Sequence, residues 1–275
     1  MKILIAADME GVTGVTHWDQ VTPGHVEYGR FRRLMTQDVN AAIEGALEAG
    51  ASEILVADGH WAGANILLEE LHPRARLNTG NPSPLSMIQG IDASVEGVFF
   101  VGYHARAGTP NAILDHTWSS KCVANVWLNE LLVGETGLNA AMCGHFDAPV
   151  LMVSGDQSVC AEAMDLLGPV EVVVVKRAGG RMSAECLPPA QSHEKICEAA
   201  VRGVRRLKEG GAPPPLRLPA PINGVIELVT SDMADRASLL PEVRRMDGRR
   251  IEFSAPDMPE AYRLFRAVVM LARAE

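Results

Sequence analysis

Three short runs of branched and aromatic apolar residues, at residues 3–7, 54–57 and 98–101, constrain the fold of this chain most strongly. Each run is too short for a helix and suits a strand that is buried on both faces. Segments of helical character lie between the runs, and this alternation is typical of parallel strands joined by right-handed crossovers. We therefore expect an α/β fold with a mostly parallel sheet and flanking helices.

The rest of the chain continues this rhythm and then changes at a proline-rich stretch, residues 210–215, which favours an extended spacer. We expect an α/β metal-binding catalytic domain over residues 1–211. Residues 212–275 form the second expected unit, a small α+β domain that would be marginal alone and is expected to make oligomer contacts. Residues 123–133 alternate and predict a hairpin. Helices are expected over residues 31–49, 66–71, 84–91, 138–145, 158–167, 190–208 and 258–272, and further strands over 150–153, 170–175, 225–229 and 250–253.

Acidic and imidazole side chains follow directly after the three apolar runs. Asp8 and Glu10 follow the first run, His60 the second and His104 the third. Positions i and i+2 of an extended chain point to the same side, so the two carboxylates are expected to lie close together. Because the carboxyl ends of parallel strands share one edge of a sheet, all four side chains are expected to converge there. Two like charges held so close repel unless a proton or a cation lies between them.

Imidazole and carboxylate ligands without cysteine suit a catalytic zinc or a similar divalent ion. The four side chains and one further carboxylate would form a dinuclear site, and Glu135, at the start of a helix, is the candidate for the fifth place. A water that bridges two metals becomes a nucleophile near neutral pH. Each residue also has a structural interpretation: a solvated strand end, a histidine bonded to a backbone carbonyl, or a glutamate at a helix N-terminus.

Four motifs in this order resemble the DppA family of zinc-dependent D-aminopeptidases: Asp-Met-Glu-Gly at 8–11, Asp-Gly-His at 58–60, Gly-Tyr-His-Ala-Arg at 102–106 and Val-Gly-Glu-Thr-Gly-Leu-Asn-Ala at 133–140. The resemblance implies a dinuclear zinc aminopeptidase that removes N-terminal, D-configured residues from short peptides or aminoacyl amides. It also implies a self-compartmentalising homo-oligomer, with a decameric ring as one form.

The resemblance assigns a role to each matched residue. It implies two Zn²⁺ per subunit, with other divalent metals as alternatives, and makes Asp8 the bridging ligand. One ion would have Glu10 and His104 as ligands. The other ion would have His60 and Glu135. It also implies that His116 is the catalytic histidine, which from the residues alone is either a general acid–base, an oxyanion stabiliser or a loop histidine.

Composition narrows the remaining alternatives. The net charge of −9 argues against a nucleic-acid partner. We expect no membrane span, and from the absence of a signal peptide we infer the cytoplasm. Five cysteines without a Cys-x-x-Cys motif support neither a disulfide framework nor a thiolate zinc site. The alternative functions are a dimetal amidase or phosphoesterase, a phosphatase with Asp8 as nucleophile, and a small-molecule binding protein without turnover.

Overall fold

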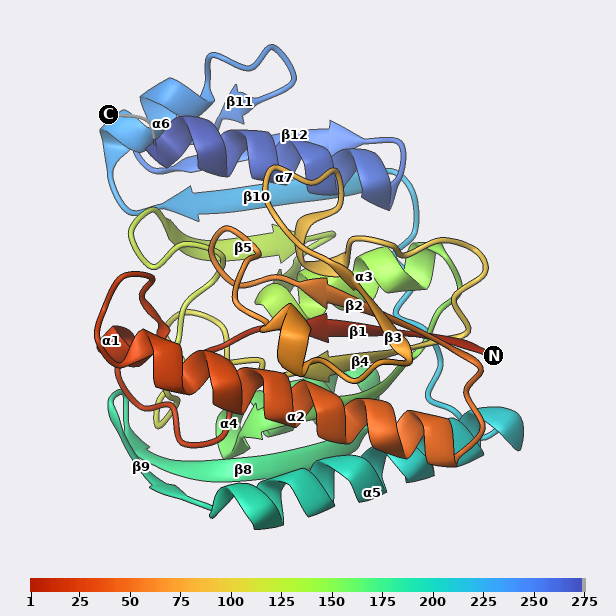
Figure 1. Cartoon of the computed structure of the whole chain (residues 1–275). Helices are drawn as coiled ribbons and strands as arrows, with labels where there is room; N and C mark the ends of the chain where they lie inside the picture. The colour runs from red at the N-terminus through yellow and green to blue at the C-terminus, as the bar shows by residue number, and fades with distance from the viewer. Residues whose placement is uncertain (274–275) are drawn as a thin grey trace.

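A computed structural model describes residues 1–273 and contains two sheets (Figure 1). The larger sheet has seven strands in the order β3-β2-β1-β4-β7-β8-β9, and all neighbours are parallel except β8 and β9. Its strands are β1 (Lys2–Ala7), β2 (Glu53–Asp58), β3 (Ala75–Asn78), β4 (Gly97–Val101), β7 (Val150–Asp156), β8 (Glu171–Gly180) and β9 (Ser183–Cys186). The predicted α/β fold with a mostly parallel sheet is confirmed.

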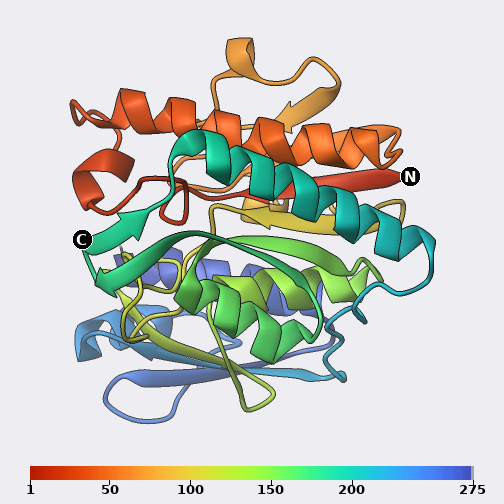
Figure 2. The ribbon, with the colours of Figure 1, turned by 90° about the horizontal axis from the view of Figure 1, so that it is seen from below.

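Helices cover both faces of this sheet. On one face α2 and α5 pack against each other and against the odd-numbered side chains of β1, such as Ile3 and Ile5. On the other face lie α3 and α4 (Figure 2), and Leu4 and Ala6 of β1 belong to the core on this side. The central strands are therefore apolar on both sides. The helices are α1 (Trp18–Val21), α2 (Tyr28–Glu48), α3 (Glu135–His145), α4 (Gln157–Leu167), α5 (Pro189–Lys208), α6 (Ser231–Ala237) and α7 (Met258–Arg273).

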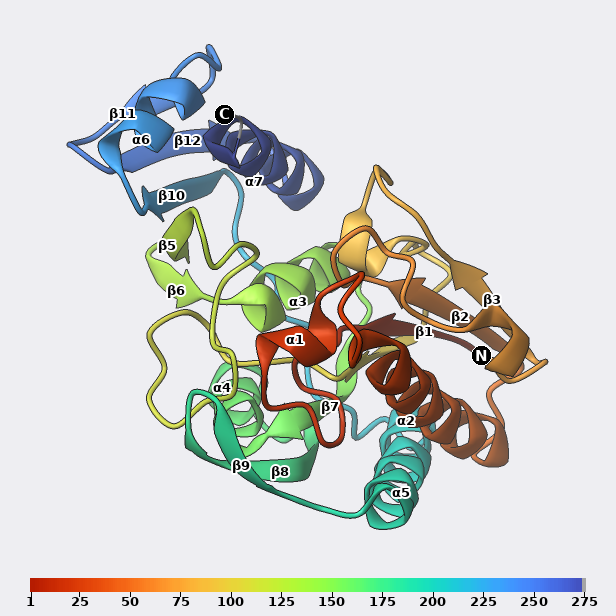
Figure 3. The ribbon, with the colours of Figure 1, turned by 60° about the vertical axis from the view of Figure 1, so that its left-hand side comes forward.

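The second sheet is antiparallel and combines two distant parts of the chain. Its order is β11-β12-β10-β5-β6, and the predicted hairpin pairs with the C-terminal segment through β5 and β10 (Figure 3). The predicted boundary at residue 211 therefore does not separate the two sheets. The strands are β5 (Val123–Leu128), β6 (Leu131–Val133), β10 (Ile222–Leu228), β11 (Arg244–Arg245) and β12 (Arg250–Ala255).

Two predicted helices are much shorter in the structure. Residues 66–71 and 84–91 contain only single 3-10 turns, η1 (Leu68–Glu70) and η2 (Ser86–Ile88). Pro73 and Pro84 limit these segments on one side, and Gly90, with φ of +100°, ends the second. Helix α6 and strand β9 were not predicted, because neither segment carries a long apolar pattern. Within residues 1–273, no helix is both long enough and apolar enough to cross a membrane.

Candidate metal centre

The carboxyl ends of β1, β2 and β4 lie side by side and bring the predicted residues together. Ala7 pairs with Asp58 on one side and with Val101 on the other, so Asp8, His60 and His104 leave the sheet at neighbouring points. The loops after β1 and β4 touch, because the Gly11 N–H donates to the Gly102 carbonyl at 2.8 Å. A side chain at Gly11 would place its Cβ 1.8 Å from the Tyr103 carbonyl oxygen, so glycine is required for this contact.

Asp8 lies between the two histidines. His60 Nδ1 is 3.3 Å from Asp8 Oδ1 and 3.0 Å from Glu10 Oε2. His104 Nε2 is 3.4 Å from Asp8 Oδ2 and 3.1 Å from Glu135 Oε1. All five residues are at most 4% exposed. The structure therefore brings all five predicted ligands into one buried cluster.

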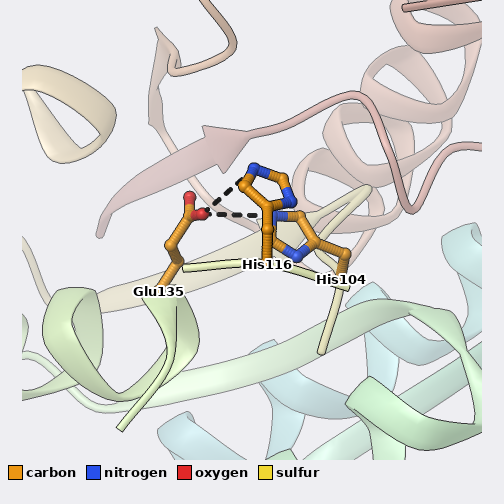
Figure 4. Close-up of side chains that lie close together, drawn as sticks. All are labelled: His104, His116 and Glu135. Atoms are coloured by element: carbon orange, nitrogen blue, oxygen red, sulfur yellow. Dashed lines mark ion pairs between the residues drawn. The ribbon is translucent and has the colours of Figure 1, made fainter. Parts of the chain in front are cut away.

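His116 faces the same cluster from slightly further away. Its Nε2 lies 3.6 Å from Glu135 Oε1 and 3.9 Å from Glu10 Oε1. Its ring stacks on His104 with 4.0 Å between ring centroids and 9° between planes. Figure 4 shows the two rings converging on one oxygen of Glu135, at the start of α3. These distances are longer than the 3.0–3.4 Å contacts of His60 and His104, which sets His116 apart from the five.

Backbone carbonyls fix the orientation of all three imidazoles. His60 Nε2 donates to Val21 O at 2.7 Å, His104 Nδ1 to Ala105 O at 3.0 Å, and His116 Nδ1 to Leu114 O at 2.8 Å. In a neutral imidazole the other nitrogen is then an acceptor, and in each case it points into the cluster. Metal-binding histidines are held in this way by their second nitrogen.

Three buried atoms in the cluster make no hydrogen bond: Asp8 Oδ2, Glu10 Oε2 and His104 Nε2. Leaving such atoms unpaired is costly in a protein interior, and cations bound in the cluster would satisfy them. Among the described residues, two groups of three side chains have donor atoms close enough to hold an ion. They are Asp8, Glu10 and His60, and His104, His116 and Glu135. The residues therefore fit a metal centre.

The pKa values of the cluster residues also indicate that the buried carboxylates need positive charge nearby. Burial raises the pKa of Asp8 to about 7, and the neighbouring Glu10 carboxylate adds to this rise. Burial opposes the charged form of His60 and His104, but the surrounding carboxylates outweigh it and raise both pKa values. Burial and the charge of His104 lower the pKa of His116. Protons on His60 and His104 thus balance the carboxylates, and bound cations would displace them.

The closest contacts group the ligands differently from the resemblance. Glu10 contacts His60 and Glu135 contacts His104, with Asp8 common to both pairs. The resemblance implied that Glu10 shares an ion with His104. Asp8 itself leaves β1 between β2 and β4, which places it next to both His60 and His104.

Two residues that sequence reasoning missed support the site. Lys176 is buried in β8, and its Nζ donates to Glu10 O at 2.6 Å and to Val12 O at 2.8 Å. Burial lowers the pKa of Lys176 to about 8. The Trp118 N–H donates to Glu135 Oε1 at 2.7 Å. Lys176 directly follows the apolar run 172–175, and a lysine at that position of the sequence could have indicated a buried charge. Trp118 acts through its backbone N–H, which no sequence motif reveals.

The long loop after Glu10 packs over the cluster. Trp18, at the start of α1, contacts the His116 ring with 5.5 Å between centroids. Arg181, between β8 and β9, lies over the Trp18 ring and also bonds to Asp115, with 2.7 Å from Nε to Oδ1 and 2.9 Å from Nη2 to the carbonyl. Arg181 therefore connects this loop to the segment that carries His116.

Comparisons with known proteins agree with this geometry. A family model described as D-aminopeptidase matches residues 1–267. A D-aminopeptidase of Bacillus subtilis (strain 168) is 36% identical over 275 residues, which cover 99% of this chain and 98% of the relative. The solved structure of the Zn-dependent D-aminopeptidase DppA from Bacillus subtilis, described as a self-compartmentalizing protease, superposes with a TM-score of 0.96. Its sequence is 35% identical, and the match covers 100% of this chain and 99% of the chain in the solved structure.

Proposed function

From the premise that the chain belongs to the D-aminopeptidase family, we propose that it is a dinuclear zinc aminopeptidase. Its substrates are short peptides or aminoacyl amides, from which it removes an N-terminal residue of D configuration. The names of the relatives support zinc and the D configuration. Nothing in the arrangement of the cluster itself selects one stereochemistry.

The position of Asp8 between two histidine–carboxylate pairs carries the proposal of two ions. Its two oxygens face opposite ways, Oδ1 toward His60 and Oδ2 toward His104. Five buried donors exceed the three protein ligands that one catalytic zinc uses. We therefore assign Asp8 as the bridging ligand, with Glu10, His60, His104 and Glu135 as the other four.

Bound zinc would polarise the scissile carbonyl and lower the pKa of the attacking water. His116 supplies the proton transfer. Its Nδ1 is committed to Leu114 O, so Nε2 is the free position and faces the cluster. The lowered pKa of His116 leaves Nε2 unprotonated near neutral pH, so that it accepts a proton and returns it to the leaving amine. Trp18, in the loop after Glu10, packs edge-on against the His116 ring.

We further propose a cytoplasmic homo-oligomer. All five cysteines are free, which suits a reducing compartment. The description of the solved relative as self-compartmentalizing supports an oligomer. Trp127 and Val225 are partly exposed on the face of the second sheet opposite the buried side chains of Ile226 and Ile251, and this face is our candidate for subunit contacts. Light scattering that gives the mass of one chain would contradict the oligomer.

The experiment removes metal from the purified protein with a chelator and adds zinc back in steps. Hydrolysis of D-alanyl and L-alanyl p-nitroanilides and of p-nitrophenyl phosphate is followed at each step. We expect activity on the D-alanyl amide to reach its maximum at two zinc ions per chain. Maximal activity at one ion contradicts the dinuclear site. Phosphoester hydrolysis would favour the phosphoesterase alternative, and no turnover at any zinc level would favour a binding protein.

A further inference from the structure

Trp118 contacts the cluster through its main chain, although it supplies no ligand. Its N–H donates to Glu135 Oε1 at 2.7 Å. The same oxygen lies 3.1 Å from His104 Nε2 and 3.6 Å from His116 Nε2. The Trp118 hydrogen bond therefore fixes the one carboxylate oxygen on which both imidazoles of Figure 4 converge.

The backbone at Trp118 is strained. Its φ is +63°, a left-handed conformation that residues other than glycine rarely adopt. The Ser119 N–H donates to Thr117 O at 2.6 Å, so Trp118 is the central residue of a γ-turn with positive φ. Such strain costs free energy and persists only where the surroundings hold it. The turn directs the Trp118 N–H toward Glu135.

The surroundings that hold this turn belong to the C-terminal helix. The Trp118 indole packs edge-on against Tyr262, with 5.7 Å between centroids, and against Phe265, with 5.2 Å. Both of these residues of α7 are at most 1% exposed. Tyr262 also donates from its hydroxyl to Asn139 Oδ1 at 2.9 Å, and Asn139 lies one turn after Glu135 in α3. Helix α7 thus supports Glu135 through the turn at Trp118 and through α3.

We propose that Trp118 is a positioning residue for the metal centre. Its side chain, held by Tyr262 and Phe265, keeps the backbone in the strained turn, and the turn places the N–H that orients Glu135. This inference rests on the proposed zinc site. According to this proposal α7, which contributes no metal ligand, helps to hold the ligand Glu135 in place.

The test compares zinc affinity among variants of the full chain, measured by competition with a chromogenic chelator at a temperature where circular dichroism shows every variant folded. W118A loses the anchor and cannot easily keep a positive φ. We expect its affinity for the more weakly bound zinc to fall about 10- to 100-fold, as for other supports of metal ligands. W118F keeps an aromatic ring against α7 and stays close to wild type. W118G adopts positive φ without strain and retains more affinity than W118A.

F146A is the control, because Phe146 is an aromatic residue packed against the same core but lies at the end of α3 opposite Glu135. If Trp118 only fills space, W118A and W118G lose the same affinity, or none, and the proposal is overturned. If W118A does not fold, F265L replaces it as the test. F265L loosens the packing of the Trp118 side chain on α7 without changing the sequence of the turn at Trp118. Wild-type affinity in F265L then contradicts the proposal. A wild-type chain that binds no zinc would instead refute the proposed function.

Discussion

Replacing Lys176 with methionine tests how the loop that carries Glu10 is held. The ammonium group is buried and donates to two carbonyls, Glu10 O and Val12 O. Methionine conserves most of the volume but leaves both carbonyls unpaired, at about 1–3 kcal/mol each. Burial lowers the pKa of Lys176 from 10.5 to about 8, so keeping it charged at pH 7 costs roughly 3 kcal/mol, which the substitution recovers. Two unpaired carbonyls cost about 2–6 kcal/mol and the removed charge offsets roughly 3, so at pH 7 we expect K176M to change stability by between a gain of about 1 and a loss of about 3 kcal/mol.

The pH dependence gives the sharper result. Between pH 8 and 10.5 Lys176 has lost its proton in the folded protein but keeps it in the unfolded chain, so the wild type gains stability as pH rises. K176M lacks this gain. The difference in unfolding free energy between wild type and K176M should therefore grow by about 2 kcal/mol from pH 7 to pH 9.5.

Urea unfolding of both metal-free proteins at one protein concentration measures this difference. Arg177→Met is the matched control, because Arg177 is exposed on the same strand, and its curve should follow that of the wild type. A difference that stays constant or narrows over this range would refute the reasoning. In the zinc-loaded protein, K176M should also bind zinc more weakly, since Glu10 is no longer held.

Three further substitutions address the site directly. D8N should lose zinc and lower activity by more than about 100-fold, because both ions lose a ligand. Two ions per D8N chain by mass spectrometry would contradict the bridging role of Asp8. H72Q, outside the cluster, is the control. H116A should keep both ions while kcat falls about 10²- to 10⁴-fold, and near-normal turnover would remove His116 from the reaction. R181M should lower kcat roughly tenfold with unchanged zinc content, because His116 loses its support through Asp115. A double variant with D115N should be no worse than the more damaging single substitution, and additive losses would argue against this shared contact.

The sequence predicted the parts of the site that depend on strand topology. Asp8, His60 and His104 each follow a buried strand, and parallel strands bring such positions to one edge whatever the loops do. No such topological rule predicts the positions of Glu135 and His116. Glu135 was a candidate only from its place at the start of a helix, and His116 came from the motifs of a known family, because their placement depends on how α3 and the segment before β5 fold back over the sheet.

What could not be predicted lies in contacts between distant segments. Trp118 acts through a backbone N–H, and any residue type carries one, so no pattern marks it. The pairing of Glu10 with His60 depends on side-chain directions at a crowded strand end. The alternation of residues 123–133 correctly predicted a hairpin, but local periodicity contains no information about which sheet the hairpin joins.

The shared second sheet has a consequence for how the chain can be divided. The proline-rich stretch looks like a natural place to cut, yet removal of everything after it would strip β5 of its neighbour β10 and take away α7. The fragment that keeps every ligand would then expose the edge of a hairpin and the apolar surface on which that helix rests. Such a fragment is expected to aggregate rather than work as a minimal enzyme. Because the two parts share this sheet, we expect them to fold and unfold together.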